Sequence, residues 1–246
     1  MRIYCPPENI TQNKITIFDH AQLHHLVDVM RRRVGDRLSI FDGQSLEYEC
    51  VIDKITKDMA ELTINSLKKI SQEKGLRVIL ACAIPKKAKI DFIIEKATEL
   101  GVERIIPLQT ERAIVRIYPD RARGKLRRWQ MIAKEAAKQC GRITLPLIEP
   151  VTPFIDALTE LKEYDLAIIP NLGVGNQDIE KVMSNFKGKS VIVFIGPEGD
   201  FSECEIELAK ASGCKGVSLG NLTLKVDTAA IAVVAFLRLS ACAEGG

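Results

Sequence analysis

Charged side chains accompany glycines in two segments near the carboxyl end of the sequence. The first, residues 195–202, reads IGPEGDFS and contains Glu198. The second, residues 219–229, reads LGNLTLKVDTA and contains Lys225 and Asp227. A carboxylate can accept a proton or orient another group, and an ammonium group stabilises negative charge on a reacting atom. Glycines let the backbone approach a ligand closely. The two segments together therefore predict a small-molecule site with ionisable groups.

The first segment needs a strand before it and a helix after it. Residues 190–195 are short, apolar and rich in β-branched side chains, which is typical of a strand buried in a parallel sheet. Such strands present ligands at their carboxyl ends. We expect Gly196 and Gly199 to provide a sharp turn, and Ser202 with Glu205 has the spacing of a capping box, so a helix should begin at 201–203. Taken alone, the segment fits an ordinary strand-to-helix loop equally well.

The second segment repeats this arrangement. Residues 216–220 form a short predicted strand that ends in glycine, and residues 228–242 form a predicted helix that is apolar on nearly every face. Asp227 or Thr228 is the predicted N-terminal cap of this helix. Such a helix is either deeply buried or packed on another subunit, and it is too short to span a bilayer. Two glycine loops in succession predict one shared pocket.

These residues resemble the SPOUT methyltransferases, and specifically the ribosomal RNA small subunit methyltransferase E family. The resemblance begins with residues 195–199 paired with 219–229. It extends to segments in the expected order along almost the whole chain, namely 25–36, 96–102, 110–112 and 139–146. It implies methylation of N3 of a uridine in 16S ribosomal RNA, with S-adenosylmethionine as the methyl donor.

The resemblance also implies a fold and a set of binding residues. The implied fold is α/β, a SPOUT-type parallel sheet with a C-terminal trefoil knot, preceded by a small PUA-like β-barrel domain. The knot would bring loops 169–175, 195–200 and 219–224 around one cofactor, and the family implies a homodimer with this pocket near the interface. The residues expected at the cofactor are Pro170, Asn171, Ile195, Gly196, Pro197, Glu198, Gly199, Leu219, Gly220, Asn221 and Leu224.

Five positions depart from the usual family pattern. Asp200 replaces a second glycine, Lys225 and Val226 replace Arg and Thr, and Lys138 replaces a Glu. Asp227 likewise stands where the family usually has Glu. A change from Arg to Lys keeps the charge but loses the planar fork that grips a phosphate or base edge. Cofactor binding is still expected, and these differences bear on efficiency and on the exact target.

Lys225 is the candidate for stabilising the anion that forms when uridine N3 loses its proton. Asp227 or Glu198 is the candidate base or orienting carboxylate. Two alternatives stay open at this stage. Lys225 also fits an ordinary phosphate contact, and Asp227 also fits a helix cap with no other role.

The chain divides into two regions by its patterns. Residues 1–70 show three short strands (38–41, 48–55 and 60–67) after a helix at 21–31, which predicts a small β-rich, barrel-like domain, and the resemblance implies that this domain binds RNA. After a polar linker at 71–75, residues 76–246 alternate strands (78–83, 104–107 and 165–169) with helices (90–100, 121–138 and 177–186). This alternation predicts a parallel sheet with helices on both faces, and the resemblance implies that residues 76–246 are the methyltransferase domain.

Basic residues are unevenly distributed in a chain whose net charge is only +3. Residues 112–142 contain ten basic and two acidic side chains, and smaller basic clusters occur at 31–33 and 86–89. Three such clusters can form a phosphate-binding surface, although a charged helix can also simply solvate its own exposed face. The candidate RNA contacts are Arg31, Arg112, Arg142, Lys86 and Lys87.

Composition fits an ordinary globular protein. The chain has 246 residues, of which 46% are hydrophobic and 27% charged. It has no long apolar run or signal pattern, and its seven cysteines are scattered without ligand spacing, so we expect a cytoplasmic protein without a metal. Two rival functions remain at this stage. One is a related methyltransferase with another RNA target, and the other is a non-catalytic RNA-binding relative.

Overall fold

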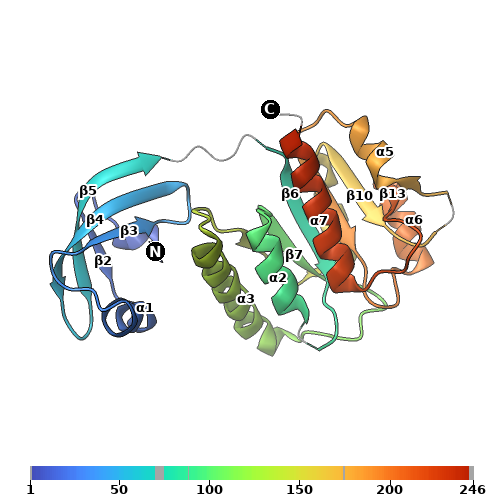
Figure 1. Cartoon of the computed structure of the whole chain (residues 1–246). Coiled ribbons are helices and arrows are strands. Elements are labelled where there is room, and N and C mark those ends of the chain that lie inside the picture. Colours follow the sequence, from blue (N-terminus) through green and yellow to red (C-terminus); the bar gives the residue numbers. More distant parts are fainter. Residues whose placement is uncertain (1, 70–74, 88, 174, 244–246) are drawn as a thin grey trace. The chain divides into compact units, whose positions relative to one another are not determined.

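The computed structural model of the chain (Figure 1) describes residues 2–69, 75–87, 89–173 and 175–243, with side chains as far as residue 240. It separates into two compact units. One comprises residues 1–74 with 137–145, and the other comprises 75–136 with 146–246. Residues 71–74 of the predicted linker lie outside the described residues. Each unit is described by itself below.

The first unit is built on a five-stranded sheet with the order β1-β3-β4-β5-β2. Its strands are β1 (Arg2–Tyr4), β2 (Lys14–Ile17), β3 (Arg37–Phe41), β4 (Leu46–Ile55) and β5 (Ala60–Lys69). Only β1 and β3 pair in parallel. Alternate residues of these strands fill a core that includes Ile15, Ile40 and Leu62, all fully buried. The three predicted strands are confirmed, and β1 and β2 were missed because they are too short to show alternation.

The predicted helix at 21–31 is interrupted. After the short turn η1 (Pro7–Asn9) and β2, helix α1 (His20–His24) is capped by Asp19, whose carboxylate accepts from two backbone amides. The chain then continues as a π-helical turn, η2 (His25–Val29), and Arg31 has a left-handed φ of 53°. The single α-helix ending at Arg31 was therefore wrong in its second half, because the bond from Met30 N to His25 O spans five residues.

The second unit is built on an eight-stranded sheet with parallel pairing throughout. Its order is β11-β13-β10-β12-β6-β7-β8, and β9 also pairs with β7. The strands are β6 (Arg77–Ala83), β7 (Arg104–Gln109), β8 (Leu147–Ile148), β9 (Thr152–Pro153), β10 (Leu166–Pro170), β11 (Gln177–Asp178), β12 (Ser190–Ile195) and β13 (Lys215–Ser218). The helices are α2 (Lys89–Glu99), α3 (Pro119–Cys140), α4 (Phe154–Leu158), η3 (Leu161–Glu163), α5 (Ile179–Ser184), α6 (Glu203–Ala211) and α7 (Val226–Ala243).

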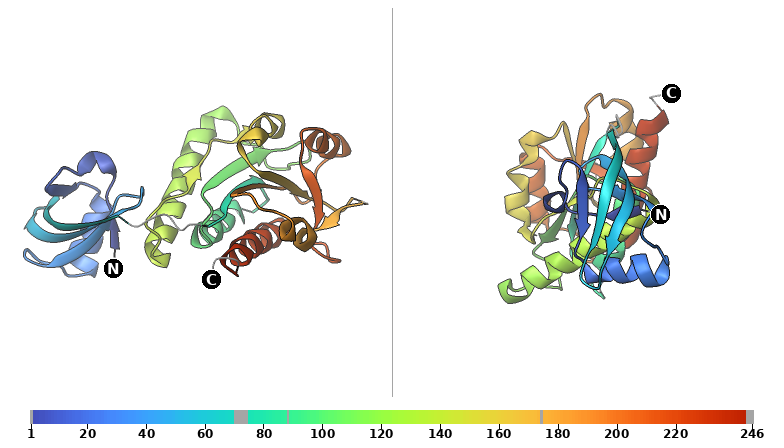
Figure 2. Two further views of the ribbon diagram at one scale, coloured as in Figure 1. Left: turned by 90° about the horizontal axis from the view of Figure 1, so that it is seen from above. Right: turned by 90° about the vertical axis from the view of Figure 1, so that its left-hand side faces the viewer.

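Helices cover both faces of this sheet, as predicted. Side chains from α2, α3, α5 and α7 pack on one face, and side chains from α4 and α6 pack on the other. Figure 2 (left) shows α7 and α2 on one side of the strands and α6 on the opposite side. All six residues of the central strand β12 are buried, which explains its unbroken apolar sequence.

Two predicted boundaries in this unit need correction. The last helix begins at Val226, so Asp227 and Thr228 lie inside its first turn and neither is the N-terminal cap. Residues 177–186 do not form one helix, because Gln177 and Asp178 pair with β13 before α5 begins at Ile179. Edge pairing of two residues leaves almost no periodic signal in a sequence. In the described part of the chain, no helix combines the length and the apolar character needed to cross a membrane.

Candidate active site

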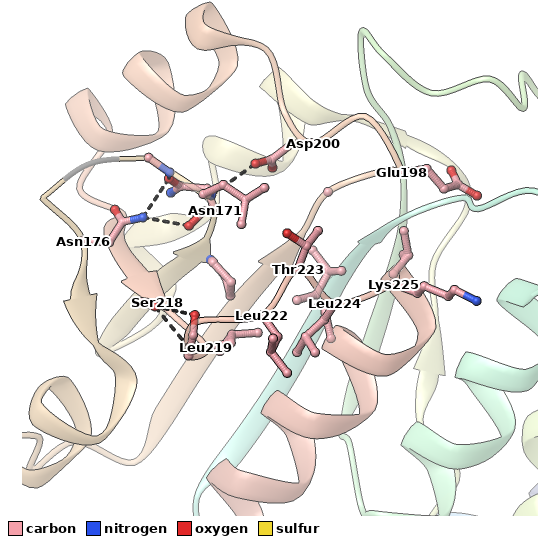
Figure 3. Close-up of a pocket in the computed structure, with 18 of the residues that line it drawn as sticks. Asn171, Asn176, Glu198, Asp200, Ser218, Leu219, Leu222, Thr223, Leu224 and Lys225 are labelled. Carbon is pink, nitrogen blue, oxygen red and sulfur yellow. Dashed lines mark hydrogen bonds between the residues drawn. The ribbon is translucent and has the colours of Figure 1, made fainter.

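A cavity of about 520 Å³ opens where β10, β12 and β13 end and α7 begins. It contains ten of the predicted site residues, namely Pro170, Asn171, Ile195, Gly196, Pro197, Glu198, Leu219, Gly220, Leu224 and Lys225. Three other predicted residues, Gly199, Asn221 and Asp227, are not among its lining residues. The three loops that the sequence predicted to share a pocket do line one cavity (Figure 3).

The loop after β12 turns at residues 198–199, where a hydrogen bond from Asp200 N to Pro197 O at 3.0 Å closes the turn. Among its residues only Asp200 has a left-handed φ, of 59°, whereas Gly196 and Gly199 do not. A Cβ at Gly199 would meet nothing nearer than Arg112 at 3.8 Å, so the local backbone does not require glycine there. Gly199 therefore lies in the predicted turn and Gly196 precedes it, but the left-handed residue of the loop is Asp200. Asp is among the few residues other than glycine that adopt this conformation at modest cost.

Asp200 also connects two of the loops. Its Oδ1 accepts from the amide of Phe201 at 2.8 Å, and its Oδ2 accepts from the amide of Leu172 at 3.3 Å. Leu172 belongs to the loop after β10, so this carboxylate joins that loop to the loop after β12. Figure 3 shows Asp200 directed toward Asn171 and its neighbours. The departure from glycine at this position thus adds a contact between loops.

Two asparagines organise the loop after β10. The side-chain amide of Asn176 donates to both the backbone oxygen and Oδ1 of Asn171, each at 2.8 Å. Asn171 Oδ1 also accepts from Gly173 N at 2.8 Å, and Asn171 Nδ2 donates to Ile169 O at 3.0 Å. Gly216 of β13 leaves space for this network, because a Cβ there would lie 2.3 Å from Asn176 Oδ1. We call Asn171, Asn176 and Asp200 the amide end of the cavity.

Apolar side chains occupy the middle of the cavity lining. Leu219, Leu222 and Leu224 come from the loop between β13 and α7. Leu222 is 79% exposed, which makes it the most exposed of the large apolar side chains that the structure describes. Ser218 Oγ accepts from Gly220 N at 3.2 Å, and Gly220 has a φ of 111° that favours glycine. This loop therefore has a fixed turn beside an open apolar surface.

The opposite end of the cavity carries charge. Glu198 and Lys225 lie there in Figure 3, away from Asn171 and Asn176. Glu198 Oε1 accepts from the backbone amide of Lys86 at 2.9 Å. The ammonium group of Lys225 has no hydrogen bond or ion pair with any described residue, and this side chain is exposed. We call Glu198 and Lys225 the charged end of the cavity.

Asp227, two residues after Lys225, is paired with a lysine. Its Oδ1 accepts from Lys89 Nζ at 2.9 Å, and both side chains are partly buried. This hydrogen bond is the main cause that lowers the pKa of Asp227 below its usual value. A carboxylate with a lowered pKa is a weak base, so the pairing favours an orienting role over proton removal.

Arg112 and Glu205 support the loop after β12 from outside. Arg112 Nη1 donates to the backbone oxygens of Gly199 at 3.1 Å and Phe201 at 3.3 Å. The predicted capping box is confirmed: Ser202 Oγ accepts from Glu205 N, and Glu205 Oε2 accepts from Ser202 N. The other oxygen of Glu205 accepts from Glu111 N at 2.8 Å. Arg112, predicted as an RNA contact, thus has a structural contact as well.

The remaining candidate RNA contacts are divided between the units. Arg31 and Arg142 belong to the first unit, and the guanidinium of Arg142 donates to Thr144 Oγ1 at 3.0 Å. Lys86 and Lys87 belong to the second unit, follow β6 and are exposed. In α3, Arg128 is engaged by Asp91 through two hydrogen bonds of 3.0 and 2.6 Å, so this basic side chain is not wholly free for RNA.

Sequence reasoning missed several lining residues. They are Leu172, Gly173, Gly175, Asn176, Asp178, Ser218, Leu222, Thr223, Val226 and Ala229, along with Asp200, which was noted only as a departure. Asn176 had a usable signal, since two asparagines flank a glycine-rich turn in which amide side chains often bond the backbone. No local sequence pattern marks the other residues, and the fold brings them to the cavity.

Two family models together match most of the chain. An RNA methyltransferase domain matches residues 72–238, and an RNA methyltransferase PUA domain matches residues 18–65. The first match contains every loop that lines the cavity. The second lies within the first unit, which is accordingly PUA-like.

Three proteins of similar sequence or structure carry the same name. Ribosomal RNA small subunit methyltransferase E of Synechocystis is 33% identical over 99% of this chain and 78% of its own length. The protein of that name from Bacillus subtilis is 30% identical over 85% of this chain and 83% of its own length. The crystal structure of the Neisseria gonorrhoeae protein, bound to S-adenosyl methionine, is 28% identical and covers 97% of both chains with a TM-score of 0.84.

Proposed function

Because the chain belongs to the ribosomal RNA small subunit methyltransferase E family, we propose that it methylates 16S ribosomal RNA with S-adenosylmethionine as the donor. The proposed target atom is N3 of a specific uridine in the small ribosomal subunit. The observation that carries the proposal is the single cavity formed by the loops after β10, β12 and β13, which contain the residues of the family resemblance. The family match indicates the type of reaction, and we propose that the reaction takes place in this cavity.

The cavity suits the proposed cofactor. S-adenosylmethionine has an apolar purine with polar edges, a ribose, and a charged amino-acid tail. Leu219 and Leu224 offer apolar surface for a purine, and the amide end offers polar groups held in place by their own hydrogen bonds. The volume of about 520 Å³ lies within the range of small-molecule pockets. When bound, the cofactor supplies a methyl group that its positively charged sulfur has already activated.

Lys225 is the proposed catalytic residue. Uridine N3 is a poor nucleophile until it loses its proton, and the anion formed is stabilised by a positive charge placed beside it. Lys225 lines the cavity, and no described residue neutralises its ammonium group. Glu198 and Asp227 are proposed as orienting carboxylates at the same end.

We propose that the first domain, residues 1–70, binds RNA and that residues 76–246 carry the methyltransferase activity. Phosphate contacts would position the RNA, and base contacts would select the nucleotide. A uridine in a paired region would have to be flipped out of the duplex. The proposed contacts are Arg31, Arg112, Arg142, Lys86 and Lys87.

Three further features are proposed on the family relationship. The loops around the cavity would belong to a C-terminal trefoil knot, the protein would act as a homodimer, and it would work in the cytoplasm with the ribosome. Exposed Leu239 on α7, 68% accessible, is consistent with a second subunit on that helix.

The direct test is methyl transfer to small ribosomal subunits from cells that lack the endogenous activity. Calorimetric titration with S-adenosylmethionine and S-adenosylhomocysteine accompanies it. We expect binding of both ligands and one new methyl group on a uridine N3, located by mass spectrometry of RNA fragments. Binding without transfer to the 16S RNA would indicate another RNA target, and absence of binding would indicate a non-catalytic RNA-binding relative.

A further inference from the structure

The carboxylates of Glu198 and Asp227 both hold one lysine-bearing segment that follows β6. We propose that they are positioning residues, which fix Lys86, Lys87 and Lys89 beside the charged end so that exposed lysines contact the RNA phosphates flanking the target. In this role neither carboxylate removes a proton. The inference rests on the proposed function and names how its RNA is positioned.

The contact made by Glu198 joins two neighbouring strand ends. Strands β6 and β12 pair in parallel, with Ile195 opposite Cys82. Their following loops therefore leave the sheet at the same edge. Glu198 Oε1 accepts from Lys86 N at 2.9 Å and connects these loops directly. A backbone amide is a fixed donor, so the bond sets the path of the chain and leaves the Lys86 side chain free.

The segment needs such support because its backbone is strained. Lys87 has a φ of 58°, in the left-handed region that residues with a Cβ seldom occupy. Such conformations persist where surrounding contacts hold them, and they are frequent at functional sites. Lys86 and Lys87 are both exposed, and no described residue forms an ion pair with either ammonium group. The strained backbone at Lys87 thus lies in a segment whose two ammonium groups, those of Lys86 and Lys87, face solvent.

Asp227 holds the other side of the segment. It accepts from Lys89 Nζ at 2.9 Å and joins the beginning of α2 to the beginning of α7. Lys225 precedes Asp227 by two residues and lines the cavity, whereas Asp227 is not part of the lining. A general base must reach the proton that it removes. The position of Asp227 fits a role in aligning α2 with α7 better than direct contact with a base in the cavity.

These contacts place three unpaired ammonium groups around one edge. Lys86 and Lys87 stand on the segment, and Lys225 stands at the cavity. Lysines act as point charges for phosphate, which suits backbone contacts that carry no sequence information. A phosphodiester is therefore the ligand chemistry that this edge fits.

Two substitutions of Glu198 distinguish its role as a hydrogen-bond acceptor from a role as a general base. Glu198→Gln retains an oxygen that can accept from Lys86 N, but it cannot act as a base. Glu198→Ala removes both capacities, and Glu207→Ala on the exposed side of α6 is the matched control. KM for RNA, kcat and the pH profile are measured for each.

We expect the control Glu207→Ala to keep kcat, KM for RNA and the pH profile, and Glu198→Gln to raise KM for RNA less than Glu198→Ala does, because its amide oxygen can still accept from Lys86 N. Glu198→Ala should raise KM for RNA about tenfold while kcat changes little, since the loss of a positioning hydrogen bond costs substrate binding. Asp227→Asn should likewise raise KM for RNA more than it lowers kcat, because it weakens the bond to Lys89. A fall in kcat of about a hundredfold or more in both Glu198 variants, with loss of the acidic limb of the pH profile, would assign Glu198 as a base and overturn the proposal.

Amide hydrogen exchange tests the contact without any activity. The Lys86 amide should be protected in the unaltered protein and in Glu198→Gln, and it should exchange faster in Glu198→Ala. Affinity for a 16S RNA fragment should follow the same order. If the protein transfers no methyl group, the proposed function fails, whereas equal exchange at Lys86 in all three proteins overturns the positioning role itself.

Discussion

The two ends of the cavity are built in opposite ways. At the amide end, Asn171, Asn176 and Asp200 direct their polar atoms to one another and to nearby backbone groups. At the charged end, Glu198 is engaged by the amide of Lys86, but the Lys225 ammonium group has no partner in the described part of the chain. The polar side chains of the amide end bond to the protein itself, whereas the Lys225 ammonium group at the charged end has no acidic partner among the described residues.

This difference indicates how a site with two substrates can bind the cofactor at one end and stabilise the reacting group at the other. A preorganised end binds a ligand with little loss of conformational entropy, which suits a cofactor used in every turnover. An unpaired cation suits a charge that develops only during reaction, because its stabilisation is then specific to the transition state. The predictions below test whether the two ends can be damaged separately.

Removal of the free charge should have the largest effect. Lys225→Met is expected to lower kcat by about a hundredfold or more, since a single charged donor in an active site contributes on that scale. Lys225→Arg should retain most of the activity, and Lys187→Met on an exposed loop is the control. Calorimetry should give an S-adenosylmethionine Kd close to that of the unaltered protein. A large rise in Kd with normal kcat would contradict the division between the two ends.

Damage to the amide end should affect binding instead. In Gly216→Ala the new Cβ would lie 2.3 Å from Asn176 Oδ1, so the Asn176 side chain must move, and its Nδ2 is displaced from Asn171. We expect the cofactor Kd to rise about tenfold, the scale of one or two lost hydrogen bonds, with kcat nearly normal at saturating cofactor. Gly124→Ala in α3, where a Cβ would have no neighbour within 4 Å, should leave Kd unchanged. Equal Kd values for the two variants would show that the asparagine network is dispensable.

Substitution of Asp200 separates its conformation from its contact. Both variants lose the side-chain bonds to Leu172 and Phe201, but Asp200→Ala keeps an unfavourable left-handed φ that Asp200→Gly adopts without strain. Denaturant unfolding should find Asp200→Ala less stable than Asp200→Gly by about 1 kcal/mol, because that is the scale of the left-handed penalty. Both should bind the cofactor a few times more weakly. If Asp200→Ala were the more stable variant, the left-handed backbone at this position would be refuted.

The smallest expected effect is the acid dependence of Asp227. Its pKa is lowered in the folded protein, mainly by Lys89, from an ordinary value of 3.8. The ion pair therefore contributes stability above that value, and this contribution is lost as the pH falls through the lowered folded pKa. The melting temperature of Asp227→Asn should lie slightly below that of the unaltered protein at neutral pH. The gap should close in strong acid, and a constant gap would indicate that charge has no part in the contact.

The elements with strong local patterns were predictable from sequence. Residues 190–195 are buried in the middle of a parallel sheet, and Ser202 with Glu205 forms the predicted capping box. Both signals lie within a few neighbouring residues. They also identified the loops at the end of the strand, because the carboxyl ends of parallel strands share one edge.

Contacts between distant segments were not predictable. The bond between Glu198 and Lys86 joins residues far apart in sequence, and no periodicity marks it. The left-handed φ at Asp200 was not predicted, because glycine has the stronger preference for that conformation. Asp227 was interpreted as a cap because capping requires only local spacing, whereas Lys89 is brought to it by the packing of α2 on α7. Sequence patterns therefore located the cavity but not the partners of its charges.

The space that Gly216 leaves for Asn176 has an evolutionary consequence. A larger residue at 216 is harmful only while Asn176 occupies that space, and loss of Asn176 removes the reason for a glycine. The two positions should behave as a coupled pair, in which the effect of one substitution depends on the residue at the other. Among diverging sequences, the two positions should then change in concert, with Gly216 lost mainly in lineages that have first lost the asparagine.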